Sequence, residues 1–124
     1  MKKEYLITPI SKPRMTRRDK WLNPARPAVA RFRSFCNEIM AAKVKLSLSD
    51  CHVTFILPLP DSTPKKIKLK LDGMPHMQKP DLDNCLKALL DSLFVNDSIV
   101  WDIRATKKWG REGKIVIETQ DYLD

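Results

Sequence analysis

The stretch KPDLDNCLKALLDSLFVND, residues 79–97, gathers acidic side chains within a basic protein. It carries Asp81, Asp83, Asp91 and Asp97, whereas the 124-residue chain has 23 lysines and arginines against 15 aspartates and glutamates. Mg²⁺ takes oxygen ligands, usually one or two carboxylates completed by waters and phosphate oxygens. A basic surface with a local group of carboxylates would let a protein hold a polyanion together with a divalent ion.

The apolar residues of this stretch recur at three- and four-residue intervals, so residues 81–94 are predicted to form an amphipathic helix. Asp83, Lys87 and Asp91 follow one another at intervals of four residues and share the polar side. One more aspartate stands at the predicted start of the helix, and another follows its end. The helix would therefore bury its leucines and present a narrow stripe of charge.

Two interpretations of these charges are open. Asp81 and Asp83 could cap the helix or interact with its dipole. Lys87 could pair with Asp83 one turn away, and Asp97 could be an ordinary turn residue. Alternatively, Asp81, Asp83 and Asp97 could hold one or two Mg²⁺ ions that bind a phosphodiester, generate hydroxide and stabilise the leaving oxygen. Lys87 would then offset charge in the transition state or orient the attacking water.

Basic residues are concentrated in the first two-thirds of the chain. Residues 1–80 hold 17 lysines and arginines against 6 acidic residues, whereas residues 81–124 hold 6 against 9. This distribution suits a polyanionic partner, with nucleic acid as the first candidate. The predicted phosphate contacts are Lys12, Arg14, Arg17, Arg18, Lys20, Lys65, Lys66, Lys68, Lys70 and Lys79.

The elements around the acidic helix follow from periodicity and turn residues. Trp101 alternates in phase with Ile99 and Ile103, which predicts that it packs on a sheet. The predicted elements are a strand at 4–10, a helix at 28–44, a strand at 51–59, and a hairpin of strands at 98–109 and 114–120 joined through GREG.

Residues 60–80 support two interpretations. Ser62 or Thr63 before a proline, with Gly73 beyond, favours a short capped helix. Apolar residues that alternate with lysines at 67–71 favour a strand instead. We prefer the helix. The expected fold class is then α/β or α+β, as one small domain over residues 1–124 with a mixed sheet of about four strands and helices packed on it.

Other classes of protein find little support. Cys36, Cys51 and Cys85 are far apart, and neither His52 nor His76 completes a zinc pattern, so buried free thiols are expected. No apolar run approaches the ~20 residues of a membrane-spanning helix, and no secretory h-region follows the first residues. A cytoplasmic protein is expected.

The pattern KPDLDNCLKALLDSL followed by NDSIV resembles the RusA family of Holliday-junction resolvases, small endonucleases frequent in phages and prophages. The resemblance implies a homodimer that binds four-way DNA junctions and nicks two strands symmetrically with Mg²⁺ or Mn²⁺. The metal-binding and catalytic aspartates of the family fall on Asp81, Asp83 and Asp97. Its essential lysine falls on Lys87.

Three further positions take part in the resemblance. Asp91 and Asp102 lie where the family tends to be acidic, and they are candidates to support the metal ligands. Asn96 occupies a place where another acidic residue occurs and is not counted as a ligand. The loop SKPRMTRRDKWLNPARP, residues 11–27, departs from the proline- and asparagine-containing loop of the family but keeps its basic character.

Three functions follow from these observations. The first is a metal-dependent, structure-specific DNA endonuclease acting on four-way junctions. The second is a nucleic-acid binding protein that keeps the fold without cutting, which would leave the aspartates unexplained as a set. The third is a basic structural protein without DNA chemistry. The first is the one that we expect.

Overall fold

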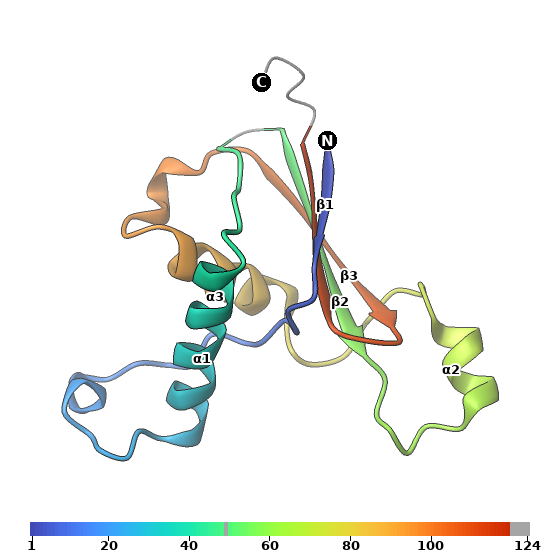
Figure 1. The fold of residues 1–124 in the computed structure, drawn as a ribbon, viewed down its shortest axis with the longest axis horizontal. Coiled ribbons are helices and arrows are strands. Elements are labelled where there is room, and N and C mark those ends of the chain that lie inside the picture. The colour runs from blue at the N-terminus through green and yellow to red at the C-terminus, as the bar shows by residue number, and fades with distance from the viewer. Residues whose placement is uncertain (49, 120–124) are drawn as a thin grey trace.

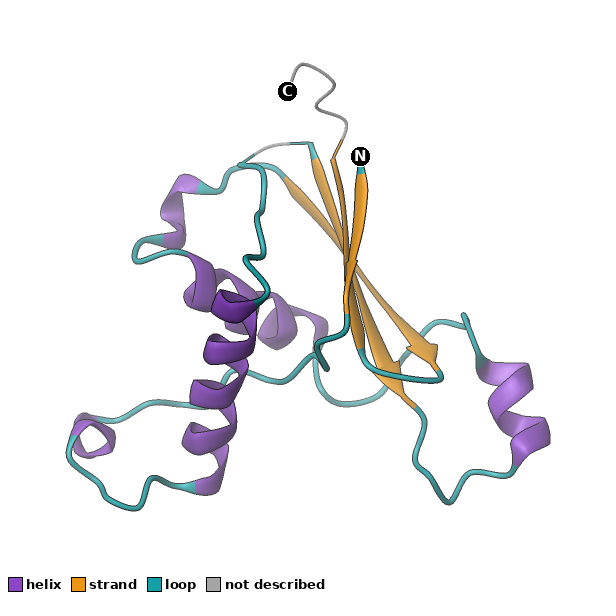
Figure 2. Ribbon diagram, in the orientation of Figure 1, coloured by secondary structure: helices purple, strands orange, loops and turns teal. Residues whose placement is uncertain are grey.

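The computed structural model describes residues 1–48 and 50–119, which form four β-strands and three α-helices (Figures 1 and 2). This small single domain confirms the predicted α+β class with a mixed sheet of four strands. In chain order the elements are β1 (Lys2–Tyr5), the 3₁₀ helix η1 (Arg17–Lys20), α1 (Pro27–Ala41), β2 (Cys51–Pro58), α2 (Lys65–Leu71), α3 (Leu82–Leu93), the 3₁₀ helix η2 (Asp97–Ile99), β3 (Ile103–Gly110) and β4 (Lys114–Thr119).

The strands lie in the order β1-β4-β2-β3, with β2 parallel to β3 and antiparallel to β4. The predicted hairpin between the last two strands is therefore wrong, because β2 lies between them. The chain leaves β2 and returns through α2 and α3, and such a crossover makes β2 and β3 parallel. β4 then returns on the other side of β2 and places the apolar β2 strand inside the sheet.

The connection from β3 to β4 passes over the end of β2 and needs two glycines there. A Cβ atom at Gly110 would collide with the side chain of Ile56 in β2. A Cβ atom at Gly113 would lie 2.7 Å from the Cα atom of Thr8, closer than side chains approach a backbone. The glycines of GREG thus serve a close crossing of the sheet end and not a two-strand hairpin.

The hydrophobic core lies between one face of the sheet and the helices α1 and α3, which pack against each other (Figure 1). α1 begins with a proline at its first position, where a missing N–H costs nothing. Its buried residues recur at helical spacing, and those of β2 alternate. The core residues are Ile7, Phe32, Phe35, Ile39, Val44, Cys51, Val53, Phe55, Cys85, Ala88, Leu89, Ile115 and Ile117.

The first and third strands differ from their predicted bounds. β1 ends at Tyr5, because the Ile7 N–H donates to the Tyr5 carbonyl oxygen and the chain turns into the core. β3 begins only at Ile103, after the 3₁₀ turn of η2. Trp101 is 76% exposed, so the prediction that it packs on the sheet is wrong. Residue 120, the predicted end of the last strand, lies outside the described residues.

The helix at residues 65–71 is confirmed, but its predicted cap is wrong. Pro64 occupies the N-cap and no side chain caps the helix. Gly73 follows at φ +83°, a conformation that favours glycine, and its N–H donates to the Trp109 carbonyl oxygen. α2 itself buries none of its residues and stands apart from α1 and α3 at the other end of the molecule (Figure 2).

The three thiols are free, as predicted, but Cys36 is only partly buried. Cys51 and Cys85 are buried in the core. Burial raises the pKa of Cys85 to about 11, against the opposing charge of Lys107. Within the described part of the chain, no helix is long and apolar enough to cross a membrane.

Candidate active site

The acidic stretch forms α3, whose polar face carries the predicted stripe. Cys85, Ala88 and Leu89 are buried beneath it, while Asp83 and Lys87 are exposed. The large apolar side chains at helical spacing fix this orientation, because turning the helix would expose the leucines to water. The stripe therefore faces away from the core, as the pattern predicted.

A chain of ion pairs runs along the stripe from the N-terminal loop to η2. The Lys12 ammonium donates to Asp91 Oδ2 at 3.0 Å. Lys87 Nζ lies 3.4 Å from Asp91 Oδ1 and donates to Asp97 Oδ2 at 3.0 Å. Two lysines and two aspartates from three segments thus alternate in charge on one side of α3.

The pKa values within this chain follow from the pairing. The hydrogen bond with Asp97, together with the charge of Asp91, raises the pKa of Lys87 above its usual value. Burial opposes ionisation of Asp91, but the hydrogen bond and charge of Lys12, assisted by Lys87, hold the Asp91 pKa below its usual value. Lys87 is therefore protonated at neutral pH and cannot act there as a general base.

Asp81 and Asp83 stand apart from this chain at the N-terminal end of α3. Asp81 occupies the N-cap position with extended backbone angles, but its side chain does not cap the helix. Both residues are exposed. Among residues 1–48 and 50–119, no cation pairs with either carboxylate within 4 Å. Their oxygens are thus open to a ligand from solution.

The structure does not gather all three predicted metal ligands. Asp97 comes from η2 and lies against Lys87, and the described residues contain no group of three or more acidic, histidine or cysteine side chains placed to hold a metal ion. The donor set itself still fits a hard cation, because Asp81 and Asp83 offer unpaired carboxylate oxygens. Asp97 would complete that set only after it exchanges Lys87 for the metal.

Asp102 lies at a different place from the stripe. One of its carboxylate oxygens, Oδ2, accepts a hydrogen bond of 3.2 Å from the Asp50 backbone N–H. It lines a cavity of about 540 Å³ at one end of the sheet, together with strand residues that include His52 and Arg104. Asp91, the other predicted supporting residue, pairs directly with Lys87.

The basic loop before α1 is ordered around a buried aspartate that the sequence pattern did not single out. Asp19 is 2% exposed and accepts hydrogen bonds of 2.9 Å from both Nε and Nη2 of Arg26. The Thr16 N–H donates to it at 2.7 Å, and Arg33 donates to its backbone carbonyl oxygen at 2.9 Å. The hydrogen bonds to its carboxylate, from Arg26 first and then from Thr16, hold the Asp19 pKa well below its usual range. The sequence did offer a signal for this arrangement, because Asp19 is the single acidic residue among the six basic residues of the loop.

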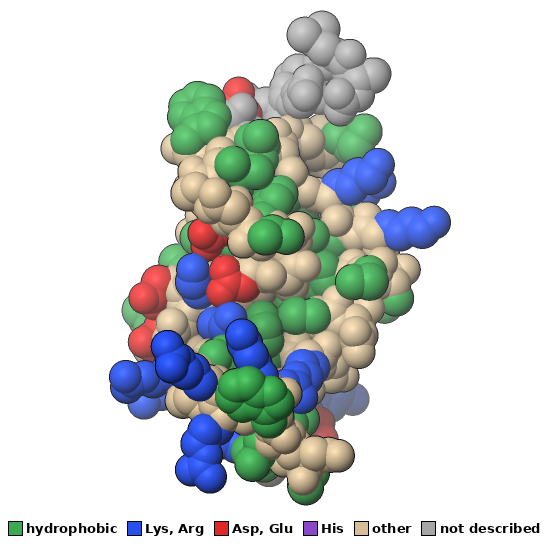
Figure 3. Space-filling view, turned by 90° about the vertical axis from the view of Figure 1, so that its left-hand side faces the viewer, with side chains coloured by type: hydrophobic (Ala, Val, Ile, Leu, Met, Phe, Trp, Pro, Cys, Tyr) green, Lys and Arg blue, Asp and Glu red, His purple; other side chains and the backbone are tan. Residues whose placement is uncertain are grey.

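Three predicted cations of the loop take no part in the bonds around Asp19 and can reach a partner. Arg17, Arg18 and Lys20 are exposed, as is Trp21 at 75%. Figure 3 shows Lys and Arg side chains gathered over the lower part of the face that carries the loop and the helices, beside a small acidic group. A basic rim therefore adjoins the acidic residues on the same face.

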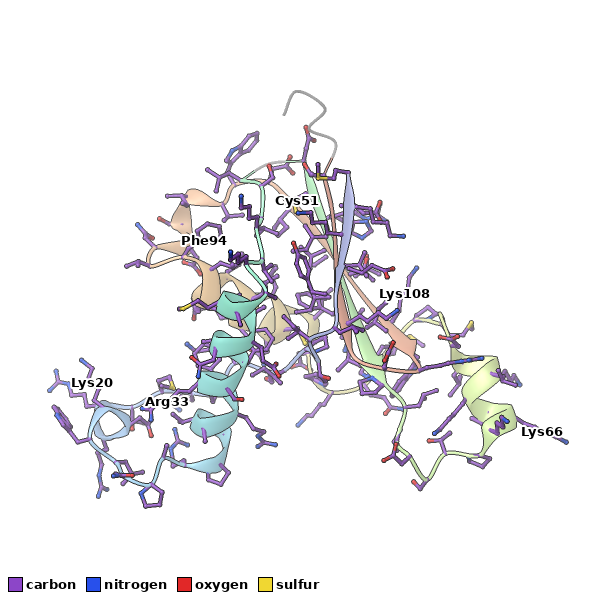
Figure 4. All side chains as sticks on the ribbon, viewed as in Figure 1. Lys20, Arg33, Cys51, Lys66, Phe94 and Lys108 are labelled. Carbon is purple, nitrogen blue, oxygen red and sulfur yellow. The ribbon has the colours of Figure 1, made fainter. Side chains whose placement is uncertain are left out.

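The predicted cations form two separate groups. Figure 4 places Lys20 and Lys66 at opposite ends of the molecule. Lys12 also differs from the remaining cations of the loop, because it pairs with Asp91 and lies 4.3 Å from the centre of the Phe32 ring. Lys79 is exposed just before α3. The cations of α2 are Lys65, Lys66, Lys68 and Lys70.

The family model described as Endodeoxyribonuclease RusA matches residues 4–120, nearly the whole chain. No curated protein matches it.

Proposed function

Because this chain belongs to the RusA endodeoxyribonuclease family, we propose that it resolves four-way DNA junctions by paired, symmetric and Mg²⁺-dependent hydrolysis of phosphodiesters. Family membership itself implies a Holliday-junction resolvase nuclease. The metal dependence and the pairing of the two cuts are the proposed part. The observation that carries the metal dependence is the pair of exposed carboxylates, Asp81 and Asp83, that no protein cation neutralises in the described part of this basic protein.

Asp81 and Asp83 would hold the metal from the start of α3, and Asp97 would join them from η2. When bound, Mg²⁺ supplies Lewis-acid chemistry and neutralises charge at a phosphodiester. Mn²⁺, which takes similar oxygen ligands, is expected to serve as well.

Lys87 has a distinct task in the proposed site. Its raised pKa keeps the ammonium charged, so it stabilises negative charge and does not abstract a proton. Asp91 holds it 3.4 Å away on the same helical face, with Lys12 on the other side of Asp91. An ammonium released from Asp97 by the arriving metal would remain tethered by Asp91 next to the reacting phosphate.

The basic loop supports the substrate part of the proposal. Arg17, Arg18 and Lys20 project from a segment that Asp19 fixes, so their positions are set before DNA arrives. Phosphate contacts of this kind position a duplex without reading its sequence. Two symmetric cuts need two active sites, which favours a homodimer on the junction. Sedimentation of the free and the junction-bound protein tests that assembly.

A second candidate is a junction-binding protein that does not cut. The ion pair of Lys87 with Asp97 favours it, because the lysine binds a carboxylate that was predicted to bind the metal.

Cleavage of a synthetic four-way junction, mapped on both strand pairs with and without Mg²⁺, separates the two candidates. The resolvase gives cuts at symmetric positions only with the metal. Asp83→Asn should lower cleavage by several orders of magnitude and bind the junction in EDTA at least as well, because one repulsion of phosphate is removed. Asp72→Asn, at the end of α2, is the matched control. Binding without cutting in both Mg²⁺ and Mn²⁺ would support the second candidate instead.

A further inference from the structure

Lys107 ties β3 to the segment that leads into α3. Its ammonium donates to the carbonyl oxygen of Gln78 at 2.5 Å and to that of Pro80 at 2.6 Å. Its own backbone carbonyl oxygen accepts a hydrogen bond of 3.1 Å from the His76 N–H. Lys107 thus holds the backbone at three positions of the segment 76–80, and the last of these, Pro80, directly precedes Asp81.

The position of Lys107 in the sheet is unusual for a charge. It shares the helix-facing side of β3 with Ile103 and Ala105, which pack against the hydrophobic core. Its neighbour Lys108 is exposed on the opposite side. A half-buried ammonium is costly unless carbonyl or carboxylate oxygens replace its water. The carbonyls of Gln78 and Pro80 supply that replacement.

The charge of Lys107 also reaches the groups around it. Burial lowers the pKa of His76, and the Lys107 charge lowers it further. The same charge opposes the burial that raises the pKa of Cys85 in the first turn of α3. The ammonium, bonded to the Pro80 carbonyl, therefore lies close to the start of α3.

The placement of Asp81 depends on the bonds from Lys107 to the Gln78 and Pro80 carbonyls more than that of an ordinary N-cap residue would. The Asp81 side chain forms no capping bond, so no hydrogen bond to the first turn of α3 sets its direction. Its placement is left to the backbone that precedes it, and Lys107 holds the carbonyl of the residue immediately before it.

We propose that Lys107 is a positioning residue for the metal-binding end of the site: it fixes the Gln78–Pro80 backbone and so aims Asp81 at the metal. This inference rests on the proposed function. Lys107 itself touches neither metal nor phosphate, and it acts through the two carbonyls. A displacement of about 1 Å in such a group can cost on the order of a hundredfold in rate.

The test compares Lys107→Met with Lys108→Met, which removes the same charge from the neighbouring, exposed position. We expect Lys107→Met to lower the kcat of junction cleavage by about 10- to 100-fold. The KM for the junction should stay within about threefold, because the DNA-binding loop is untouched. Lys107→Arg should recover part of the kcat, since a guanidinium can also donate to two carbonyls. Lys108→Met should keep the wild-type kcat.

A second measurement does not depend on activity. Hydrogen exchange of the amides at residues 76–83 should accelerate about tenfold or more in Lys107→Met, while exchange in α1 and β2 stays unchanged. Titration with Mn²⁺, followed by its electron paramagnetic resonance signal, should show weaker binding to this variant. If Lys107→Met does not fold, Lys107→Gln takes its place under the same criteria.

Failure of the inference and failure of the proposed function are distinguishable. Wild-type protein that binds junctions without cutting them would contradict the proposed function. The hydrogen-exchange and Mn²⁺-binding measurements would still test the role of Lys107. Lys107→Met that matches Lys108→Met in kcat, exchange and Mn²⁺ binding would overturn the positioning role. A uniform acceleration of exchange over the whole chain would also overturn it, because that pattern reports general destabilisation.

Discussion

Lys87 lies between two aspartates, and one of them is a predicted ligand of the metal. Its ammonium donates to Asp97 at 3.0 Å and lies 3.4 Å from Asp91. A divalent ion must therefore compete with a lysine for Asp97. The same lysine is proposed to stabilise negative charge during cleavage. It would therefore hinder metal binding but assist the reaction once the metal is bound.

Replacing Lys87 by methionine separates these roles. Lys87→Met should raise the affinity for Mn²⁺ severalfold, because the competing ammonium is gone, and should still abolish junction cleavage. Calorimetric titration with Mn²⁺, together with a cleavage assay, measures both effects. Lys108→Met is the control for loss of one positive charge. Weaker Mn²⁺ binding in Lys87→Met would show that the lysine helps to form the site and does not compete for it.

The pairing of Lys87 marks the limit of what the sequence predicts about single side chains. Helical spacing correctly placed Asp83, Lys87 and Asp91 on one face. It offered Asp83 as the partner of Lys87, whereas the structure pairs Lys87 with Asp91 and Asp97. The contact with Asp97 depends on how the chain turns after Phe94 and folds η2 back toward α3, and no local periodicity encodes that turn.

Among the elements, the N-terminal loop depends on Asp19 for its order. Asp19→Asn keeps the size of the side chain but removes the charge that binds Arg26. We expect the loop amides to exchange faster and the junction affinity to fall. The plot of log affinity against log salt should become less steep by about 0.9 for each phosphate that the loop no longer neutralises. Asp61→Asn, in the exposed turn before α2, is the control. An unchanged salt slope together with unchanged exchange would contradict this role.

Asp91 joins the loop to α3 through Lys12, and this tie depends on pH. The pKa of Asp91 is held below its usual value, so the folded protein binds its proton less readily than the unfolded chain does. The stability from this tie is present above the unfolded pKa, about 3.9, and is lost as pH falls through the lower folded pKa. Urea unfolding should therefore show wild type more stable than Asp91→Asn at pH 6, with a gap that shrinks in acid. A gap independent of pH would contradict the assignment.

Helices and strands differed in how well local sequence predicted them. The apolar spacing of α1 and α3 sufficed, because a helix satisfies its own backbone hydrogen bonds. The segment GREG carries the glycines of a hairpin turn, yet its strands pair with β2 and not with each other. Strand partners are chosen by contacts far apart in the chain, and the close approach of Gly113 to Thr8 has no local signature.

Most of the predicted DNA-binding cations lie at two opposite ends of the molecule, one group on the loop and one on α2 (Figure 4). A branched substrate has arms in several directions, and we expect the loop and α2 to contact different arms of it. Changing Lys65 and Lys66 to alanine should therefore weaken binding to a four-way junction more than binding to a duplex. Changing Arg17 and Arg18 to alanine should weaken both alike. Gel shifts at two salt concentrations measure this, and equal weakening by both pairs of substitutions would show that α2 does not distinguish branched DNA.

The strand order has a consequence for how the protein is made. Of the strands in the described sheet, β1 is the first to leave the ribosome, and its only partner there is β4, the last. The interior strand β2 likewise lacks one neighbour until β4 is translated. Pairings so distant in the chain form slowly, and unpaired strand edges invite association with other chains. The nascent protein must therefore carry an incomplete sheet until residues 114–119 are made, when β1 and β2 gain their missing partner.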